Sequence, residues 1–426
     1  MNQDLLKERL ANHQYDDVLH KIYIDAGRIP YQRDRYLCAL SQFEVHFGQG
    51  DIVVFSAPGR SEIGGNHTDH QQGEVLAAAV NLDTIAVVRK TNDNGVCVLS
   101  DGYPMITVDL DFLDKKEEEK GTTKALVKGV LYEAKKRGYA VGGFEAYITG
   151  DVLVGAGLSS SASFETLIGT IVSGLYNDMN IPQTEIACIG QFAENKYFGK
   201  PCGLMDQMAC AVGGLVHIDF KDKGNPVVEG VDFDLNQHGY SLCIIDTKGS
   251  HADLTEDYAA VPGEMKAVAE IFGKHVLREV AKEDIFTSLN EIRRQLGDRA
   301  ALRAIHFFEE NERVSEEVAS LQSKNVDRFL ELVKASGDSS YKYLQNVYTN
   351  RDIEHQNISI ALAVSEIFLK QNGVARVHGG GFAGTIQAFV RDETVESYQK
   401  VMEEIFGKGA CQVLKIRKDG GIKVFG

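Results

Sequence analysis

The sequence predicts an α+β protein of two domains. The chain has 426 residues, more than one compact hydrophobic core usually organises. Apolar residues make up 43% and charged residues 25% of the chain, which is typical of a folded globular protein. Stretches with strand periodicity and stretches with helix periodicity follow one another without a regular βαβ series, which favours α+β.

The first 50 residues have helical patterns. Apolar residues over 31–47 recur at helical spacing, and Gly48 and Gly50 then end the predicted helix. Pro30 separates this segment from an earlier helical stretch. We therefore expect an N-terminal helix over about 1–30, either packed on the surface or used as an oligomer contact.

Strand patterns predominate from there to about residue 150. The first is the β-branched run Ile52–Phe55. Further strands are predicted over 84–88, 96–99, 106–110 and 144–149, and a helix over 123–137. A Gly-rich stretch comes next, and helices are predicted over about 161–176 and 183–197.

The pattern changes at Gly214. Strands are predicted over 215–220, 241–246 and 411–416, with two more beside the glycines of 379–384, and helices over most of 258–369 and over 394–406. The chain has only seven prolines and no Pro-rich linker. We therefore expect a tight boundary near residue 215, between an N-terminal domain over 1–215 and a C-terminal domain over 216–426.

Charge and cysteine usage disfavour several classes of protein. The net charge is −16, with no Lys/Arg cluster large enough to form a basic face for nucleic acid. No apolar run reaches the roughly 18 residues of a membrane span, and the N-terminus lacks the apolar segment of a signal peptide. The seven cysteines are dispersed and never spaced as CxxC. We expect a cytoplasmic monomer or small homo-oligomer without nucleic-acid or membrane partners.

A Gly/Ser-rich segment is the strongest candidate for a phosphate site. It consists of Gly155, Ala156, Gly157, Leu158, Ser159, Ser160, Ser161 and Ala162. It follows a predicted strand and opens a predicted helix, where free N–H groups and the helix dipole attract anions. The alternative is an ordinary helix N-cap with a flexible approach. GxxxxGK[ST], HRDxxxxN and DFG are absent, and no GxGxxG stands in a dinucleotide-binding context, so a phosphate site here is of another kind.

Polar residues are concentrated in a second segment, residues 57–70, which has a turn-like composition. It contains Arg60, Glu62, His67, Asp69 and His70, a density of charge that is costly in a buried core. Such a segment fits a site that binds substrate hydroxyl groups through hydrogen bonds. The alternatives are a solvated loop, or a metal site formed by His67, Asp69 and His70.

Two further segments carry candidate residues. Asp206 lies three residues after Gly203 amid apolar neighbours, and Glu194 precedes both. Asp206 could act as a general base, and the alternative is a helix N-cap. The glycines of 379–384 form either a turn between strands or a loop that closes over a ligand.

Together these segments resemble the galactokinase family, which belongs to the GHMP small-molecule kinases. The matching stretches are APGR at 57–60, GxGLSSSA at 155–162, CGLMDQ at 202–207 and GGGFAG at 379–384. The resemblance runs from about Leu37 to the C-terminus. It implies two α+β domains with the active site in the cleft between them. It also implies transfer of the ATP γ-phosphoryl group to the anomeric hydroxyl of galactose, which gives α-D-galactose 1-phosphate.

The resemblance also implies roles for single residues. Asp206 takes the proton of the anomeric hydroxyl, and Arg60 lies beside Asp206 and the γ-phosphate. A nearby cation keeps a carboxylate ionised and offsets charge on the transferred group. Ser161 and Glu194 match the Mg²⁺ ligands, and both offer the hard oxygen atoms that Mg²⁺ requires.

The other carried-over positions bind the two substrates. The segment from Gly155 to Ala162 matches the family's phosphate-binding segment for ATP. The positions that contact the sugar match His67, Asp69, Gly203 and Tyr258.

Three positions depart from the family pattern. The family usually has Asn, Glu and Tyr where this chain has Glu62, Asn66 and His70. We expect Asn66 to face the C6 group of the sugar. An amide both donates and accepts hydrogen bonds, so it would tolerate a C6 hydroxyl and also a C6 carboxylate. Galacturonate or another galactose-like sugar is therefore an alternative substrate, and the His-x-Asp-His-Gln run is similar to galacturonokinase.

A non-catalytic sugar sensor of the same family is a further alternative. Such homologues tend to lose residues of the Ser-Ser-Ser-Ala segment. This chain keeps Ser161, Ala162, Arg60 and Asp206, which favours an active kinase.

Overall fold

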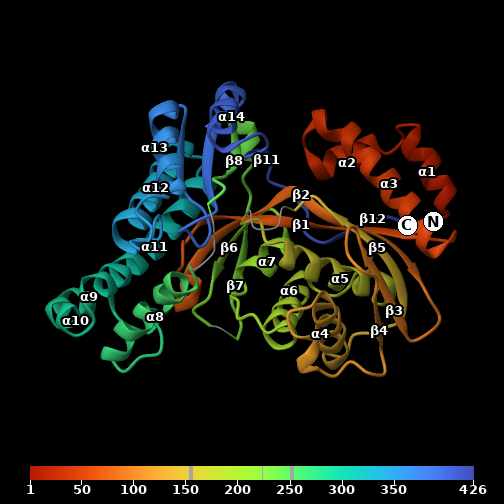
Figure 1. The fold of residues 1–426 in the computed structure, drawn as a ribbon, viewed down its shortest axis with the longest axis horizontal. Helices are drawn as coiled ribbons and strands as arrows, with labels where there is room; N and C mark the ends of the chain where they lie inside the picture. Colours follow the sequence, from red (N-terminus) through yellow and green to blue (C-terminus); the bar gives the residue numbers. More distant parts are fainter. Residues whose placement is uncertain (153–156, 223, 250–253) are drawn as a thin grey trace.

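Two β-sheets organise the computed structural model, which describes residues 1–152, 157–222, 224–249 and 254–426 (Figure 1). In these residues the larger sheet has the order β12-β1-β2-β5-β3-β4, with β6 paired to β2 and β7 to β6. Its strands are β1 (Val53–Gly64), β2 (Glu74–Lys90), β3 (Gly95–Ser100), β4 (Ile106–Asp109), β5 (Phe144–Gly150), β6 (Leu215–Asp219), β7 (Val227–Val231) and β12 (Ile422–Phe425). The smaller sheet, of order β11-β8-β10-β9, contains β8 (Tyr240–Asp246), β9 (Gly373–Val377), β10 (Thr385–Arg391) and β11 (Cys411–Leu414).

Helices cover both faces of the larger sheet. One face carries α1 (Gln3–Ala11), α2 (Asp16–Tyr23) and α3 (Ile29–Phe47), and the other carries α4 (Thr123–Lys136), α5 (Ser160–Tyr176), α6 (Gln183–Phe192) and α7 (Met205–Val212) (Figure 1). Successive residues of a strand point to opposite faces. In β1, Val54 packs in the core under α1–α3, whereas Phe55 packs in the core under α4–α7. Both faces of the central strands are therefore buried.

The smaller sheet and the remaining helices form the other half of the molecule (Figure 1). The helices are α8 (Thr255–Ile271), α9 (Lys282–Thr287), α10 (Leu289–Leu296), α11 (Asp298–Gln322), α12 (Val326–Ser339), α13 (Asn357–Leu369) and α14 (Asp392–Phe406). One apolar cluster joins the two halves, because it contains Ile63 and Leu76 of the larger sheet together with Val314 of α11 and Phe389 of β10. None of the helices in the described ranges is both long and apolar enough to cross a membrane.

The α+β class is confirmed, but the sheets do not divide at the predicted boundary. Strands β6 and β7 follow residue 215 and still belong to the larger sheet, and β12 returns to pair with β1. Strand β6 joins the larger sheet because β2 is long enough to pair with two strands along the same edge. Residues from Thr84 onward pair with β5, and Glu74–Ala78 pair with β6. The chain changes sheet between β7 and β8.

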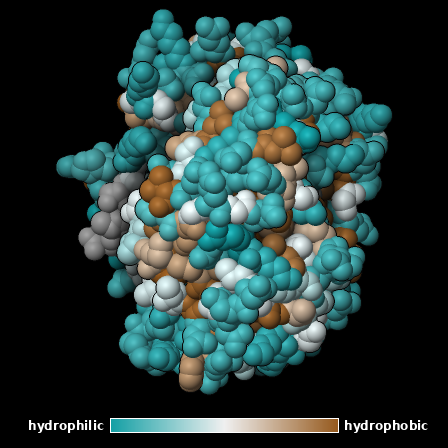
Figure 2. All heavy atoms as spheres, turned by 90° about the vertical axis from the view of Figure 1, so that its right-hand side faces the viewer, coloured by the Kyte–Doolittle hydropathy of each residue, from teal (hydrophilic) through white to brown (hydrophobic). Residues whose placement is uncertain are grey.

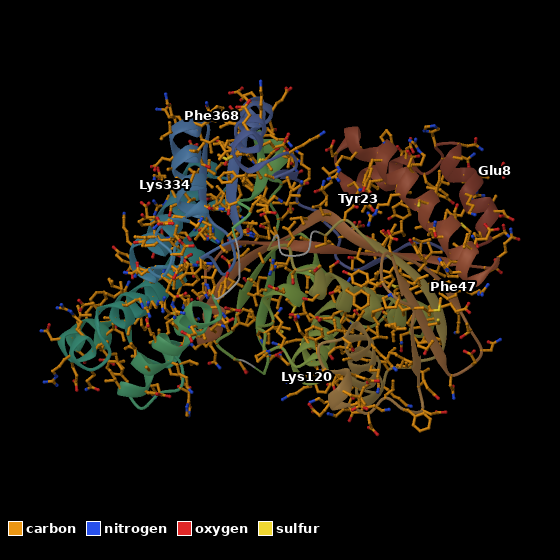
Figure 3. All side chains as sticks on the ribbon, viewed as in Figure 1. Glu8, Tyr23, Phe47, Lys120, Lys334 and Phe368 are labelled. Carbon is orange, nitrogen blue, oxygen red and sulfur yellow. The ribbon has the colours of Figure 1, made fainter. Side chains whose placement is uncertain are left out.

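The N-terminal segment differs from the single extra helix predicted over about 1–30. It contains α1, α2 and a short 3₁₀ turn, η1 (Ala26–Arg28). Pro30 lies in the first turn of α3, where its missing N–H costs no helical hydrogen bond. Tyr23 lies between α2 and the sheet (Figure 3), and its hydroxyl donates to Asp83 Oδ2 over 2.9 Å. The face with these helices is mostly hydrophilic with separate hydrophobic patches (Figure 2).

Candidate active site

Arg60 and Asp206 form a bidentate pair at the centre of the site. Arg60 Nε lies 2.7 Å from Asp206 Oδ1, and Nη2 lies 2.6 Å from Oδ2. Arg60 Nη1 also donates to the Gly157 carbonyl, and Ser159 Oγ donates to Asp206 Oδ2 over 2.8 Å. Arg60 belongs to β1 and Asp206 to the first turn of α7. The structure thus brings three of the predicted segments together.

The pair keeps Asp206 ionised. Burial favours the neutral acid, but the charge and hydrogen bonds of Arg60, together with the Ser159 hydroxyl, outweigh burial and lower the pKa of Asp206 below its ordinary 3.8. Burial likewise disfavours the charged guanidinium, yet Asp206 raises the pKa of Arg60. The Asp206 side chain remains 28% exposed. A carboxylate that is charged and still partly open can accept a proton from a bound hydroxyl.

The Gly/Ser segment reaches this pair from the start of α5, which begins at Ser160. Ser159 has a left-handed backbone with φ +54°. Gly157 has φ +69°, and a Cβ there would lie 2.8 Å from His378 Nδ1, so only glycine fits. The side chains of Leu158 and Ala162 are buried, so they pack inside the protein. Gly155 and Ala156 lie outside the described residues.

The two predicted Mg²⁺ ligands are neighbours. Ser161 Oγ donates to Glu194 Oε1 over 3.2 Å. Glu194 lies in a π-helical turn, η4 (Ala193–Phe198). Its carboxylate also accepts hydrogen bonds from Lys200 Nζ at 3.1 Å and Gln207 Nε2 at 2.8 Å. Sequence reasoning missed Lys200 and Gln207 in these roles, because nothing in their local pattern marks them.

The Ser161 hydroxyl and the Glu194 carboxylate suit Mg²⁺ better than they suit a metal ion that is coordinated by protein atoms alone. Among the residues that the structure describes, no group of three or more His, Cys, Asp or Glu side chains could hold a metal ion. Mg²⁺ commonly takes one or two protein oxygens and completes its shell with water and phosphate oxygens. One hydroxyl and one carboxylate match that pattern. The alternative of a metal site formed by His67, Asp69 and His70 has no support among the described residues.

A cavity of about 380 Å³ opens beside the Gly/Ser segment. Its lining includes Thr84, Tyr103, Thr123, Leu126, Val152, Phe164, Ser160 and Ser161. No local sequence pattern marks this cavity, since the lining residues come from separate strands, helices and loops. Apolar and hydroxyl-bearing walls of this kind suit a planar heterocycle.

Asn66 is expected to face the C6 group of the sugar, but its side chain is engaged within the protein in this structure. It is fully buried. Its amide nitrogen donates to Glu62 Oε1 at 3.0 Å and to the Gly379 carbonyl at 2.8 Å. Its amide oxygen accepts from Asn346 Nδ2 at 2.9 Å and from Ser340 Oγ at 3.2 Å. All four hydrogen-bonding positions of the amide are used within the protein.

Glu62 is the charged partner of this amide. It accepts a hydrogen bond from Arg376 of β9, and the two side chains are 7% and 1% exposed. Burial raises the pKa of Glu62, and the charge of Arg376 only partly opposes the rise. The third departing residue, His70, has a side chain that is 39% exposed and lies beside His67. Glu62 and Asn66 therefore form buried contacts that connect the 57–70 segment to Arg376 and Gly379.

His67 has one ring nitrogen without a hydrogen-bond partner. Its Nε2 donates to the Gly380 carbonyl over 3.1 Å, because a carbonyl can only accept. Its Nδ1 is therefore unprotonated, and it is buried without a hydrogen-bond partner. Burial and the neighbouring His70 lower the pKa of His67 to about 4, which keeps the ring neutral at physiological pH. A donor hydroxyl of a substrate would satisfy Nδ1.

The other residues predicted to contact the sugar are Asp69, Gly203 and Tyr258. A Cβ on Gly203 would lie 2.3 Å from Asp69 Oδ2, so Gly203 packs directly against that carboxylate. The Tyr258 hydroxyl donates to the Gly381 carbonyl over 2.8 Å. Ser61 and His378 Nε2 form a further contact at 3.0 Å between the two halves of the molecule. The site thus lies where the two sheets meet.

Comparison with protein families gives two matches. Residues 41–90 match the galactokinase galactose-binding signature, and residues 125–214 match the GHMP kinases N terminal domain. The first range contains Arg60 and the loop with His67, and the second contains the Gly/Ser segment and Asp206.

Individual relatives give the same family. The galactokinase of Glaesserella parasuis serovar 5 is 32% identical over 372 residues, 86% of this chain and 93% of the relative. The galactokinase of Clostridium tetani is 30% identical, over 85% of this chain and 90% of the relative. The Lactococcus lactis galactokinase, solved with galactose, is 26% identical with a TM-score of 0.76, over 91% of this chain and 100% of that one. Methanococcus jannaschii mevalonate kinase, at 15% identity and a TM-score of 0.61, shares the fold over 86% of this chain and 99% of its own. The chain therefore belongs to the galactokinase family of GHMP kinases.

Proposed function

We propose that the protein transfers the γ-phosphoryl group of ATP to the anomeric hydroxyl of galactose and releases α-D-galactose 1-phosphate. The bidentate pair of Arg60 and Asp206, bordered by Ser159 and Gly157, is the observation that carries this proposal. The relatives named as galactokinases and the structure solved with galactose support the choice of sugar.

Asp206 accepts the proton of the sugar hydroxyl as the hydroxyl oxygen attacks phosphorus. Its lowered pKa makes it a weak base. A weak base is sufficient, because phosphoryl transfer passes through a loose transition state with little bonding to the nucleophile. Arg60 keeps the carboxylate ionised and offsets the negative charge of the group in transfer. Holding the hydroxyl next to Asp206 also supplies the alignment that the reaction needs.

Ser161 and Glu194 would hold Mg²⁺, which supplies positive charge to the phosphate oxygens when it is bound. Lys200 and Gln207 orient the Glu194 carboxylate through hydrogen bonds to its two oxygens. We propose that the cavity lined by Tyr103, Thr123 and Phe164 takes the adenine ring of ATP, since it borders Ser160 and Ser161.

We propose that His67 Nδ1 and the Asp69 carboxylate accept hydrogen bonds from sugar hydroxyls. The unpartnered Nδ1 and the room that Gly203 leaves for Asp69 support this proposal. Tyr258 holds the Gly379–Gly384 loop beside them. Because the Asn66 amide makes all its hydrogen bonds within the protein, we propose no contact between Asn66 and the sugar. A cytoplasmic location and a monomeric or small homo-oligomeric state stay predictions from the sequence.

A sugar panel tests the proposed function. The purified protein is mixed with ATP and Mg²⁺ and with galactose, glucose or galacturonate, and ADP release is measured. We expect turnover with galactose and a phosphorus NMR signal split by the anomeric proton. Turnover with galacturonate but none with galactose would overturn the choice of sugar. ATP binding without turnover on any sugar would instead indicate a sensor.

A further inference from the structure

The N-terminal helix α3 makes direct contact with the strand end that forms one wall of the nucleotide cavity. Helix α3 and the Gly/Ser segment at the start of α5 lie on opposite faces of the larger sheet (Figure 1). We infer that α3 helps to position ATP. It acts through Tyr31 and Arg35, which contact Asp151. This inference rests on the proposed use of ATP by this site.

Three side chains of α3 converge on Asp151, which directly follows β5. The Tyr31 hydroxyl donates to Asp151 Oδ1 over 2.8 Å, and Gln32 Nε2 lies 3.4 Å from Oδ2. Arg35 Nη1 lies 3.3 Å from the same Oδ2. The Asp151 side chain is 15% exposed. One carboxylate thus receives contacts from a full turn of the helix.

Arg35 also joins two strands. Its Nη2 donates to the carbonyls of Asp83 in β2 and Thr149 in β5, over 2.9 and 3.2 Å. Its Nη1 lies 2.6 Å from Asp83 Oδ1. The Asp151 N–H in turn donates to the Asp83 carbonyl over 2.9 Å. Arg35 therefore fixes the middle of β2 and the end of β5 relative to each other.

The same parts of β2 and β5 form the cavity wall. Thr84, Thr149, Gly150 and Val152 all line it, together with Ser160 and Ser161 of the phosphate-binding segment. Val152 also lies 3.0 Å from the position of a Cβ on Gly59, the residue before Arg60. The Thr84 hydroxyl contacts Ser163 of α5 over 2.9 Å. A shift of Asp151 would therefore displace residues in the wall of the cavity and at the start of α5.

The loop that holds the sugar does not share these contacts. His67 and Asp69 contact the Gly379–Gly384 loop and Gly203 respectively, and neither is bonded to α3. Loss of the α3 contacts should consequently weaken ATP binding and leave the affinity for galactose unchanged. A residue that merely stabilised the fold would affect both substrates alike.

The test compares variants of the full-length protein. Asp151→Ala removes all three contacts, Tyr31→Phe removes one, and Asp151→Asn keeps an acceptor for Tyr31. Arg33→Ala is the matched control, because Arg33 of α3 makes a bidentate pair with Asp16 of α2, at 3.0 and 2.7 Å, that does not reach β5. Each variant is assayed for the KM of ATP, the KM of galactose and the dissociation constant of ATP measured without sugar. Thermal denaturation checks that each variant is folded.

We expect Asp151→Ala, which removes three contacts, to raise the KM and the dissociation constant of ATP by about tenfold. Tyr31→Phe, which removes one hydrogen bond, should raise both by about threefold. Asp151→Asn should recover part of the affinity, and Arg33→Ala should match the wild type. Unchanged ATP affinity in Tyr31→Phe and in folded Asp151→Ala would overturn the inference, as would an equal loss in Arg33→Ala. Failure of the wild-type protein to bind ATP would contradict the proposed function instead.

Discussion

Arg60 and Asp206 are 146 residues apart in the sequence, yet two hydrogen bonds join their side chains. Local sequence could identify both, because each stands in a recognisable polar or glycine-containing segment. It could not show which way Asn66 points. The partners of its amide, Asn346 and Gly379, lie about 300 residues away, and an amide serves a sugar or a protein network equally well.

Replacing Asn66 tests its internal role. Asn66→Ala leaves the buried Ser340 hydroxyl and the Gly379 carbonyl without this partner, so we expect a loss of about 2 kcal/mol or more in the free energy of unfolding. Urea denaturation measures it. Asn94→Ala, at an exposed loop position, should change stability by less than about 0.5 kcal/mol. Wild-type stability of Asn66→Ala would contradict the buried network.

At the scale of elements, the helices over 123–137 and 161–176 were predictable, whereas the full lengths of β1 and β2 were not. The helix predicted over 123–137 is α4, and the one predicted over about 161–176 is α5. By contrast, β1 continues through Gly64, where a turn-like segment was predicted, and β2 begins at Glu74, ten residues before the strand predicted over 84–88. Nearly every residue of both strands is buried, so no alternation of polar and apolar residues marks them.

The turn before α7 packs against Asp69, which we propose binds the sugar. A Cβ on Gly203 would meet Asp69 Oδ2 at 2.3 Å, so the carboxylate must move in Gly203→Ala. We expect the KM for galactose to rise about tenfold, since overpacking costs about 1–3 kcal/mol, while the KM for ATP stays unchanged. Gly230→Ala is the control, because no atom lies within 4 Å of its Cβ position. An unchanged galactose KM in Gly203→Ala would show that Asp69 has no part in binding the sugar.

At the scale of the whole molecule, Glu74 connects the larger sheet to the helical half. His217 Nε2 of β6 lies 3.0 Å from Glu74 Oε2, the Ser315 hydroxyl of α11 donates to the same oxygen over 2.7 Å, and Arg278 contacts Oε1 at 3.2 Å. Burial alone would raise the pKa of Glu74, but these hydrogen bonds and the Arg278 charge outweigh it and lower the pKa to about 2. The sequence could not predict this junction, because its residues come from four separate segments.

The stability that Glu74 contributes should depend on pH. Its pKa is lower in the folded state than the ordinary 4.5, so the contribution is complete above pH 4.5 and is lost as pH falls toward 2. Glu74→Gln should lower the free energy of unfolding by about 1–2 kcal/mol at pH 7. Thermal denaturation at pH 7 and pH 3 should show this difference shrinking with acidity. A difference that is the same at both pH values would contradict the assignment.

Asp206 is the proposed proton acceptor in the phosphorylation of galactose. The deciding measurement is the kcat of Asp206→Asn with saturating galactose and ATP, beside the dissociation constant of ATP and an Asp232→Asn control at an exposed position. The amide cannot take the proton but keeps the shape of the side chain, so kcat should fall at least about a hundredfold while ATP binding is retained. A kcat equal to that of the wild type would contradict the assigned role of Asp206 and the mechanism built on it.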